Sequence, residues 1–224
     1  MHNEISRKIN INIHGNVKTK LDKLYYNNLK VYEQHFKKNY SYIIEQFYSS
    51  SLSLTQCPKC NHTTDNHEPL SILTLTLKNG YNSLYDCIDE YVSKISLDDD
   101  NKLKCEKCND YVNSNKKNVF WDLAPILMIL LKKYNENGVI SNFVKYPTKL
   151  NMNSYCLNYK EKSTNYELSG LIIHNGGLNS GHYYSICKNS LENKWKIYND
   201  TSVSDIDESN IFNKHPYFLF YKRV

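Results

Sequence analysis

The sequence predicts an α+β fold, in which helices near the N-terminus precede a β-rich remainder. Three observations support this prediction: apolar residues at helical spacing near the start, two Cys-x-x-Cys pairs, and apolar residues in alternation through the second half. The chain has 224 residues and 40% of them are hydrophobic, enough for one large domain or two small ones. The 20 tyrosines and 7 phenylalanines predict an aromatic core.

Residues 1–50 are expected to be helical. Residues 21–36 carry apolar side chains at the spacing of one helix face, and Ser41 can cap a second short helix. After the serines at 49–51 the pattern changes to short alternating runs. Leu73, Leu75 and Leu77 predict a strand, and an amphipathic helix is expected over residues 84–95.

The last part of the chain is predicted to be rich in strands. The expected strands cover residues 118–121, 126–131, 166–174, 182–188, 194–200 and 217–222. The sequence contains no internal repeat and no long linker. We therefore expect a single domain with a helical entry segment at 1–50, a cysteine-rich part at 51–117 and a β-rich part at 118–224.

Charge and hydropathy argue against two classes of partner. The formal net charge of +5 is spread along the chain, because lysine pairs such as Lys132-Lys133 are separated by acidic and aromatic residues. The longest apolar run, residues 126–131, is far short of the roughly 20 residues of a membrane-spanning helix. We expect neither nucleic acid nor a membrane as partner. The first residues lack the apolar segment of a signal peptide, which favours an intracellular protein, cytoplasmic or nuclear.

Two Cys-x-x-Cys pairs predict a structural zinc site. The predicted ligands are Cys57, Cys60, Cys105 and Cys108. Each pair can place two thiolates on one side of a metal ion, and two pairs complete a tetrahedral zinc site with no open position. The alternatives are metal-free pairs or a redox motif. The redox alternative is disfavoured because neither pair opens a helix in a βαβ context.

Two histidines near these pairs and the three remaining cysteines are interpreted as residues without a metal-binding or catalytic role. His62 and His67 could replace a zinc ligand, but we interpret them as loop histidines. Cys87, Cys156 and Cys187 lie in apolar surroundings, which favours buried small hydrophobic residues over reactive thiols.

The strands at 182–188 and 194–200 are predicted to form a β-hairpin. With the loop centred on Leu191, the antiparallel register pairs Cys187 with Trp195 and His182 with Asp200. An aspartate held opposite a histidine can orient the imidazole of a general base. The alternative is a polar cross-strand pair on a solvated face, and a register slip by one residue would replace Asp200 by Asn199.

Two motifs in the hairpin region are hard to obtain by chance: Gly-His-Tyr at 181–183, and Trp-x-x-Tyr-Asn-Asp-x-x-Val at 195–203. Further segments precede or follow them in a defined order, at residues 1–4, 42–60, 103–108, 123–134, 146–150, 166–176 and 217–221. In this order they resemble the ubiquitin-specific proteases, the papain-like deubiquitinases, over nearly the whole chain. One departure is Ala124, which stands where the family has a proline.

The resemblance implies a partial papain-like cysteine peptidase fold, with an antiparallel β-rich palm, a zinc-binding β fingers extension and N-terminal helices. It implies a thiol protease that hydrolyses ubiquitin C-terminal peptide or isopeptide bonds, with ubiquitin or ubiquitinated proteins as partners. His182 would be the general base and Asp200 its orienting residue, and Asn199 of the same motif is a further candidate catalytic residue. The structural zinc ion would be held by the two cysteine pairs.

The family's nucleophile lies in a Gly-x-Thr-Cys-Tyr box at the start of the domain, and residues 1–50 contain no cysteine. We therefore expect fingers and most of the palm without the Cys box, inactive unless another chain carries the missing half. A second hypothesis is a non-catalytic ubiquitin-binding module. A third, a zinc-ribbon nucleic-acid binder, is disfavoured by the acidic run at 98–100.

Overall fold

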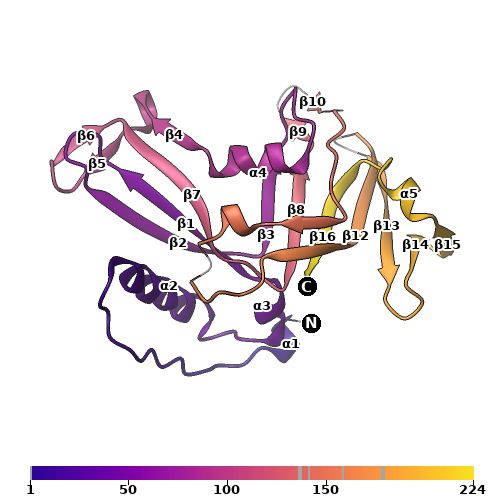
Figure 1. Cartoon of the computed structure of the whole chain (residues 1–224), viewed down its shortest axis with the longest axis horizontal. Helices are drawn as coiled ribbons and strands as arrows, with labels where there is room; N and C mark the ends of the chain where they lie inside the picture. The colour runs from indigo at the N-terminus through magenta and orange to yellow at the C-terminus, as the bar shows by residue number, and fades with distance from the viewer. Residues whose placement is uncertain (1, 136–137, 141, 158, 178–179) are drawn as a thin grey trace. The chain divides into compact units, whose positions relative to one another are not determined.

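The structure is a computed structural model that describes residues 2–135, 138–140, 142–157, 159–177 and 180–224 (Figure 1). Over these residues the chain forms two compact units. Unit 1 comprises Met1–Ser71, Val92–Ala124 and Asn153–Lys162, and unit 2 comprises Ile72–Tyr91, Pro125–Met152 and Ser163–Val224. Helices combine with mainly antiparallel sheets, which confirms the α+β prediction. The division at residues 1–50, 51–117 and 118–224 stays a prediction.

Unit 1 begins with helices α1 (His2–Ile5), α2 (Lys20–Phe36) and α3 (Tyr42–Phe47). A capping box starts α2, because Thr19 Oγ1 accepts the N–H of Asp22 while the Asp22 carboxylate accepts the N–H of Thr19. Ser41 is the N-cap residue of α3 as predicted. Its hydroxyl, however, contacts His2 Nδ1 at 2.8 Å and makes no capping bond.

The main sheet of unit 1 has the strand order β2-β1-β7-β4. Its strands are β1 (Ser49–Gln56), β2 (Thr63–Leu70), β7 (Ser114–Asp122) and β4 (Lys94–Leu97). A small ladder joins β5 (Leu103–Cys105) to β6 (Asp110–Val112), and single 3₁₀ turns cover Asp99–Asn101 and Asn153–Tyr155. The sequence gives no sign of β2, which is polar and forms because its whole length pairs with β1.

His67 is a buried core residue, so its interpretation as a loop histidine is wrong. It lies on β2, is 4% exposed, and packs edge-on against Trp121 with ring centroids 5.2 Å apart. Tyr25 of α2 and Tyr159 stack on each other at 4.5 Å, and both rings also lie near Trp121. An aromatic cluster therefore joins α2 to the sheet.

Unit 2 contains a larger sheet with the strand order β15-β14-β13-β12-β16-β8-β3, and β11 also pairs with β12. The strands are β3 (Ile72–Thr76), β8 (Ile126–Lys132), β11 (Lys149–Asn151), β12 (Asn165–Gly176), β13 (Gly181–Asn189), β14 (Lys194–Asn199), β15 (Ser202–Ile206) and β16 (Pro216–Arg223). The smaller elements are β9 (Tyr134–Asn135), β10 (Gly138–Val139) and α5 (Glu208–Ile211). The β3–β8 pair is parallel, and the other pairs of this sheet are antiparallel.

The core of unit 2 follows the predicted alternation. Leu73 and Leu75 of β3 are buried, as are the alternate apolar residues of β8. Helix α4 (Leu84–Val92) buries Leu84 and Ile88 but ends before Ile95. The predicted last turn is wrong because residues 94–97 pair with β7 as a strand instead.

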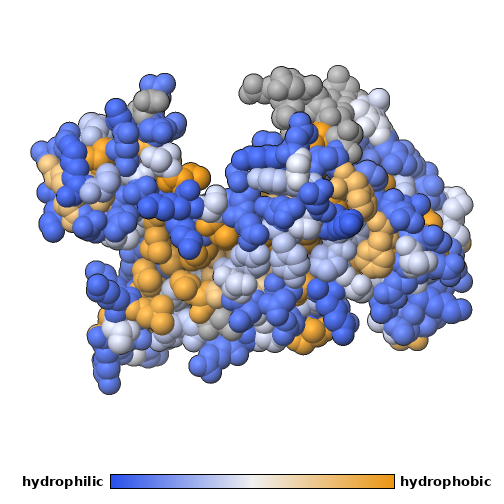
Figure 2. Space-filling view, turned by 45° about the horizontal axis from the view of Figure 1, so that its top comes forward, coloured by the Kyte–Doolittle hydropathy of each residue, from blue (hydrophilic) through white to orange (hydrophobic). Residues whose placement is uncertain are grey.

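One part of the surface of unit 2 is hydrophilic. Figure 2 shows the part of unit 2 on the right, where β13, β14 and β15 lie in Figure 1, as mainly hydrophilic. Among the described residues no helix combines the length and the apolar character that crossing a membrane requires.

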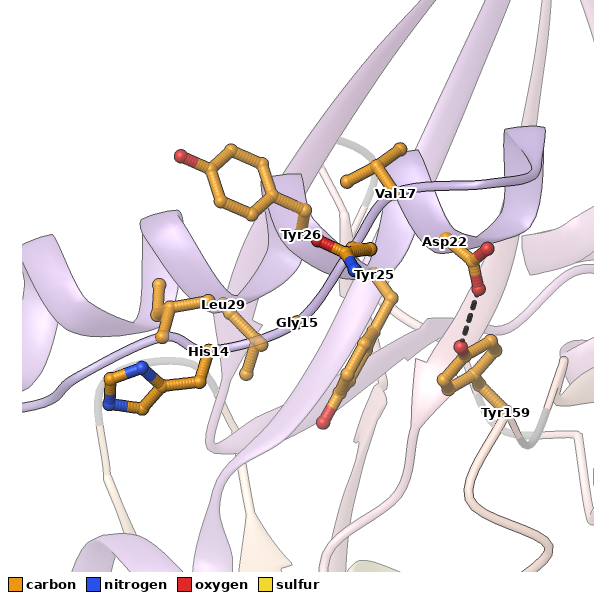
Figure 3. A pocket seen from close by; sticks show the side chains of 10 residues that line it. His14, Gly15, Val17, Asp22, Tyr25, Tyr26, Leu29 and Tyr159 are labelled. Carbon is orange, nitrogen blue, oxygen red and sulfur yellow. Dashed lines mark hydrogen bonds between the residues drawn. The ribbon is translucent and has the colours of Figure 1, made fainter.

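Unit 1 contains a hollow of about 180 Å³ between α2 and the segment 13–17. Figure 3 shows Asp22 and Tyr159 at one side of it, joined by a 2.7 Å hydrogen bond in which the phenol donates. The other carboxylate oxygen accepts backbone N–H groups of Lys18 and Thr19. Donation by Tyr159, and then by Thr19, lowers the pKa of Asp22 to about 2. The carboxylate thus accepts three hydrogen bonds from within the chain.

We expect Tyr159→Phe to raise the pKa of Asp22 toward its ordinary value of 3.8, because the largest cause of the shift is removed. A carboxyl group with a depressed pKa stabilises the fold above its unfolded-state pKa, and the effect is lost as pH falls through the folded-state value. The stability difference between wild type and Tyr159→Phe should therefore shrink between about pH 4 and pH 2. Urea unfolding and the carboxyl carbon resonance of Asp22 measure both effects.

Tyr26→Phe is the matched control, since Tyr26 lines the same hollow without bonding to Asp22. It should leave the Asp22 titration unchanged. If Asp22 titrates identically in wild type and Tyr159→Phe, the assigned cause of the shift is wrong.

Candidate functional site

Four cysteine thiols gather in unit 1, as the two Cys-x-x-Cys pairs predict. Cys57 and Cys60 lie in the β1–β2 connection, Cys105 is the last residue of β5, and Cys108 lies in the β5–β6 connection. All four Sγ atoms lie within 4.8 Å of one another. The Sγ–Sγ distances are 3.9 Å from Cys57 to Cys108 and 3.7 Å from Cys60 to Cys105. The four side chains could therefore hold one metal ion.

The two connections are built alike. In each, an asparagine follows the second cysteine with a positive φ, 56° at Asn61 and 54° at Asn109. Its N–H donates to the carbonyl of the first cysteine, at 2.9 Å for Cys57 and 2.7 Å for Cys105. Asparagine tolerates this left-handed conformation better than most residues. The repeated Cys-x-Lys-Cys-Asn sequence is a local signal of this turn.

Without a bound cation, the pKa values of two thiols in the cluster shift in opposite directions. A hydrogen bond that the Cys108 thiol donates to Cys60 raises the pKa of Cys108 to about 12. At Cys57, burial opposes ionisation, but backbone N–H groups of Cys60 and Lys59 bring the pKa down to about 7. Close thiolates repel one another, so a divalent cation is the partner that lets all four ionise. The predicted alternative ligands, His62 and His67, are not part of the cluster.

The second candidate site lies in the β13–β14 hairpin, whose predicted register is wrong by one residue. The structure pairs Trp195 with Lys188, whereas the sequence predicts Cys187 as its partner. Asn189 remains in the ladder, and its Oδ1 accepts the N–H of Leu191 at 2.9 Å. The loop is thereby shortened to residues 190–193, which moves the centre of the turn.

This register places His182 and Asn199 on one face of the sheet. Ile186 lies directly opposite Ile197, and opposed residues of an antiparallel pair share a face. His182 is four residues before Ile186 and Asn199 two residues after Ile197, so both keep that face.

Asn199 makes the closest contact with the histidine. His182 Nε2 lies 2.5 Å from Asn199 Oδ1 and 3.8 Å from Asp200 Oδ2. Asp200 occupies the turn that Asn199 and Ser202 close, with a φ of 50°. The predicted catalytic residues are therefore brought together. The hydrogen bond expected from Asp200 is made by Asn199, with the carboxylate close by.

The contact determines which imidazole nitrogen is basic. Asn199 Oδ1 can only accept, so Nε2 of His182 carries the hydrogen and Nδ1 is left to accept a proton. The His182 side chain is 50% exposed and that of Asp200 is 77% exposed. A proton donor from outside can therefore reach the imidazole, and the carboxylate lies close enough to stabilise the imidazolium form.

Two glycines allow the approach of β12 and β13 just before His182. Gly176 pairs with Gly181, and its φ of 151° is one that side chains rarely adopt. A Cβ atom at Gly181 would collide with the ring of His174, which stacks on Tyr183 at 4.3 Å. The glycine of the Gly-His-Tyr motif is thus required by packing.

The cysteines outside the cluster do not resemble an activated nucleophile. Burial raises the pKa of Cys87 to about 11, and burial also raises the pKa of Cys187. Cys187 lies five residues after His182 on the same strand, so it faces the opposite side of the sheet. The thiol of Cys156 contacts the carbonyl oxygen of Trp121 at 3.7 Å, in unit 1.

Comparison with known proteins identifies the family. The family model described as ubiquitin carboxyl-terminal hydrolase matches residues 2–221. A probable ubiquitin carboxyl-terminal hydrolase of Acanthamoeba polyphaga mimivirus is 34% identical over 203 residues, which cover 85% of this chain and 43% of that protein. Ubiquitin carboxyl-terminal hydrolase 8 of Saccharomyces cerevisiae is 32% identical and covers 80% of this chain and 41% of its own length. This chain thus spans less than half of either relative.

Solved structures agree with this assignment. The yeast SAGA DUB module matches with a TM-score of 0.76 at 29% identity, over 87% of this chain and 45% of that one. A SAGA DUB module bound to monoubiquitin matches with a TM-score of 0.75 at 28% identity, over 91% of this chain and 47% of that one. The fold predicted from the motifs is therefore confirmed. This chain belongs to the ubiquitin carboxyl-terminal hydrolase family.

Proposed function

We propose that this chain supplies the general base and its orienting groups for thiol hydrolysis at the carboxyl terminus of ubiquitin. The observation that carries the proposal is the contact of His182 Nε2 with Asn199 Oδ1, with the Asp200 carboxylate 3.8 Å away. These residues come from the motifs that the family resemblance marks as catalytic. The exposed imidazole is accessible to a substrate and to a thiol.

In the proposed mechanism each group has a role. Nδ1 of His182 takes the proton of a cysteine thiol, and the thiolate attacks the carbonyl carbon of the bond after ubiquitin's last residue. Asn199 keeps the hydrogen on Nε2, and Asp200 stabilises the imidazolium. The imidazolium then protonates the leaving amine, and water hydrolyses the thioester with His182 again as base.

The nucleophile in this proposal comes from outside the given sequence. Four of the seven cysteines form the cluster, and the other three are buried or half-buried with contacts of their own. We infer a second segment or chain that carries the family's Cys box.

A second candidate is a ubiquitin-binding module without chemistry. The observation that favours it is the raised pKa of the thiols of Cys87 and Cys187, which disfavours their reactive thiolate forms. A related solved structure is described as bound to monoubiquitin, which supports ubiquitin as a partner under either proposal. The two candidates share the binding surface and differ in turnover.

We further propose that the metal of the cysteine cluster is a structural Zn²⁺. Four thiolates are a set of soft ligands that suits tetrahedral zinc. The buried cluster around the four cysteines contains only Cys57, Cys105 and Val112 among the described residues. The bound metal would therefore supply stability that a larger hydrophobic core supplies elsewhere. Free thiolate ligands persist in a reducing compartment, which fits the proposed intracellular location.

Turnover tests the catalytic proposal. The chain alone should not cleave a fluorogenic ubiquitin C-terminal reporter. Adding a segment that carries a Gly-x-Thr-Cys-Tyr box in trans should produce cleavage, and His182→Ala should then lower kcat/KM by roughly 10²-fold or more, the usual contribution of a general base. His174→Ala is a control histidine on the neighbouring strand, and it should retain most of the activity.

Turnover by the chain alone that His182→Ala abolishes would mean that one of its own cysteines is the nucleophile. Turnover that survives His182→Ala in the restored enzyme would overturn the assignment of the base.

Metal content and ubiquitin binding test the structural proposal. We expect one zinc ion per chain by elemental analysis. Cys105→Ser should lower the zinc content and the melting temperature, because removing one of four ligands weakens a site coupled to folding. It should also weaken binding of monoubiquitin in a calorimetric titration.

Cys156→Ser is the matched control, since this thiol lies outside the cluster. It should retain zinc and bind ubiquitin as wild type does. Full zinc content in Cys105→Ser would contradict the assigned ligand set.

A further inference from the structure

An ion pair crosses between the two cysteine turns of unit 1. Lys59 Nζ lies 2.5 Å from Asp110 Oδ2, and the two residues are 51 positions apart in the sequence. Lys59 lies inside the first turn, between Cys57 and Cys60. Asp110 is the first residue of β6 and pairs directly with Cys105 of β5. The ion pair therefore joins the same two turns that supply the four thiols.

The charges of this pair lie next to the cysteine cluster. The Lys59 ammonium interacts electrostatically with the thiols of Cys57 and Cys108, one from each turn. Four thiolates outweigh the charge of one divalent ion, so the metal-loaded cluster would be anionic. The Asp110 carboxylate adds a further negative charge beside it, and the Lys59 ammonium offsets both. The metal-loaded cluster therefore gains more from the cation of Lys59 than a cluster of neutral thiols would.

The second turn offers a comparison within the same chain. Its sequence Cys-Glu-Lys-Cys-Asn matches Cys-Pro-Lys-Cys-Asn of the first turn, so Lys107 occupies the position equivalent to that of Lys59. Two residues after the second cysteine, the first turn has His62 and the second turn has Asp110. Lys107 is exposed and makes no ion pair among the described residues. Two lysines at equivalent positions thus differ in whether they connect the turns.

We propose that the ion pair of Lys59 with Asp110 holds the two turns together and slows the release of the metal ion. This inference rests on the proposed structural Zn²⁺ and assigns a positioning role to two residues that are not ligands. A departing ion must lose the ligands of both turns, and it does so faster when the turns can separate. Few apolar residues surround the four cysteines, so the ion pair is one of the contacts that oppose this separation.

The expected effect is moderate. The two side chains are 59% and 55% exposed, and an exposed ion pair by itself changes an equilibrium by up to about fivefold. Residues that hold metal ligands in place commonly change metal affinity by roughly 10–100-fold. The ion pair of Lys59 with Asp110 belongs between these two cases, because it is exposed but joins the two halves of the ligand set.

The rate of zinc release tests the proposal. The zinc-loaded full chain is mixed with an excess of the colorimetric chelator pyridylazoresorcinol, and the zinc transferred is followed by absorbance. Lys59→Met keeps the aliphatic stem but removes the charge, and it should release zinc roughly three- to tenfold faster than wild type. Lys107→Met removes the same charge from the other turn and should stay within about twofold of wild type. Both lysines are exposed, so both variants should fold.

A charge exchange separates a direct ion pair from an effect of net charge. Lys59→Asp places two carboxylates against each other and should release zinc fastest. Adding Asp110→Lys to it restores a pair of opposite charges and should slow the release again. Adding Glu106→Lys instead makes the same change of charge at an exposed position of the second turn, without restoring the pair, and should slow the release much less. At about 1 M NaCl, where charges are screened beyond about 3 Å, the difference between wild type and Lys59→Met should shrink.

Equal release rates for wild type and Lys59→Met would overturn the proposal, and so would an equal acceleration by Lys107→Met. In both cases zinc bound by wild type would still support the metal assignment. A wild-type chain that binds no zinc would overturn the metal assignment and this inference together.

Discussion

The register of the antiparallel strands β12 to β15 is the constraint on which the proposed catalytic site of unit 2 depends. Side chains alternate between the two faces of a strand, so a shift of β14 by one residue would move Asn199 away from His182. The same shift would turn Trp195 out of its buried position. Asn189 and the tight turn at Asp200 determine this register, because they set the lengths of the two connections. Turn chemistry thus decides which polar groups meet the imidazole.

Much of the fold follows from residue patterns. The helical spacing at 21–36 and the alternation at 126–131 predicted α2 and β8, because each reflects one buried face. The β2 strand was missed because Thr63–Leu70 is polar and contains a proline, and it forms through pairing with β1. His67 was misassigned for the same reason. The hairpin register was wrong by one residue because an asparagine side chain, which periodicity does not detect, shortens the loop.

The cysteine cluster combines a local signal with a long-range one. Each Cys-x-x-Cys turn is local, and its asparagine in the left-handed conformation can be recognised from the sequence. The meeting of the two turns is not local, because 44 residues separate Cys60 from Cys105. Part of that intervening chain belongs to unit 2. Few apolar residues surround the four cysteines, so they stabilise the contact between the two turns only weakly. A metal ion bound by both turns would stabilise this long-range contact.

The two functional hypotheses differ in one chemical requirement, a thiolate within reach of Nδ1 of His182. The contact with Asn199 holds the imidazole in the tautomer that can accept a proton, an arrangement that ubiquitin binding alone does not need. Position 181, next to His182, also has to be glycine, because a side chain there would displace His174. The arrangement of the base is therefore better explained by catalysis than by binding. The cysteine environments point the other way, because burial raises the pKa of Cys87 and Cys187 and Cys156 lies in unit 1. Both observations are satisfied if the nucleophile belongs to a segment outside this sequence.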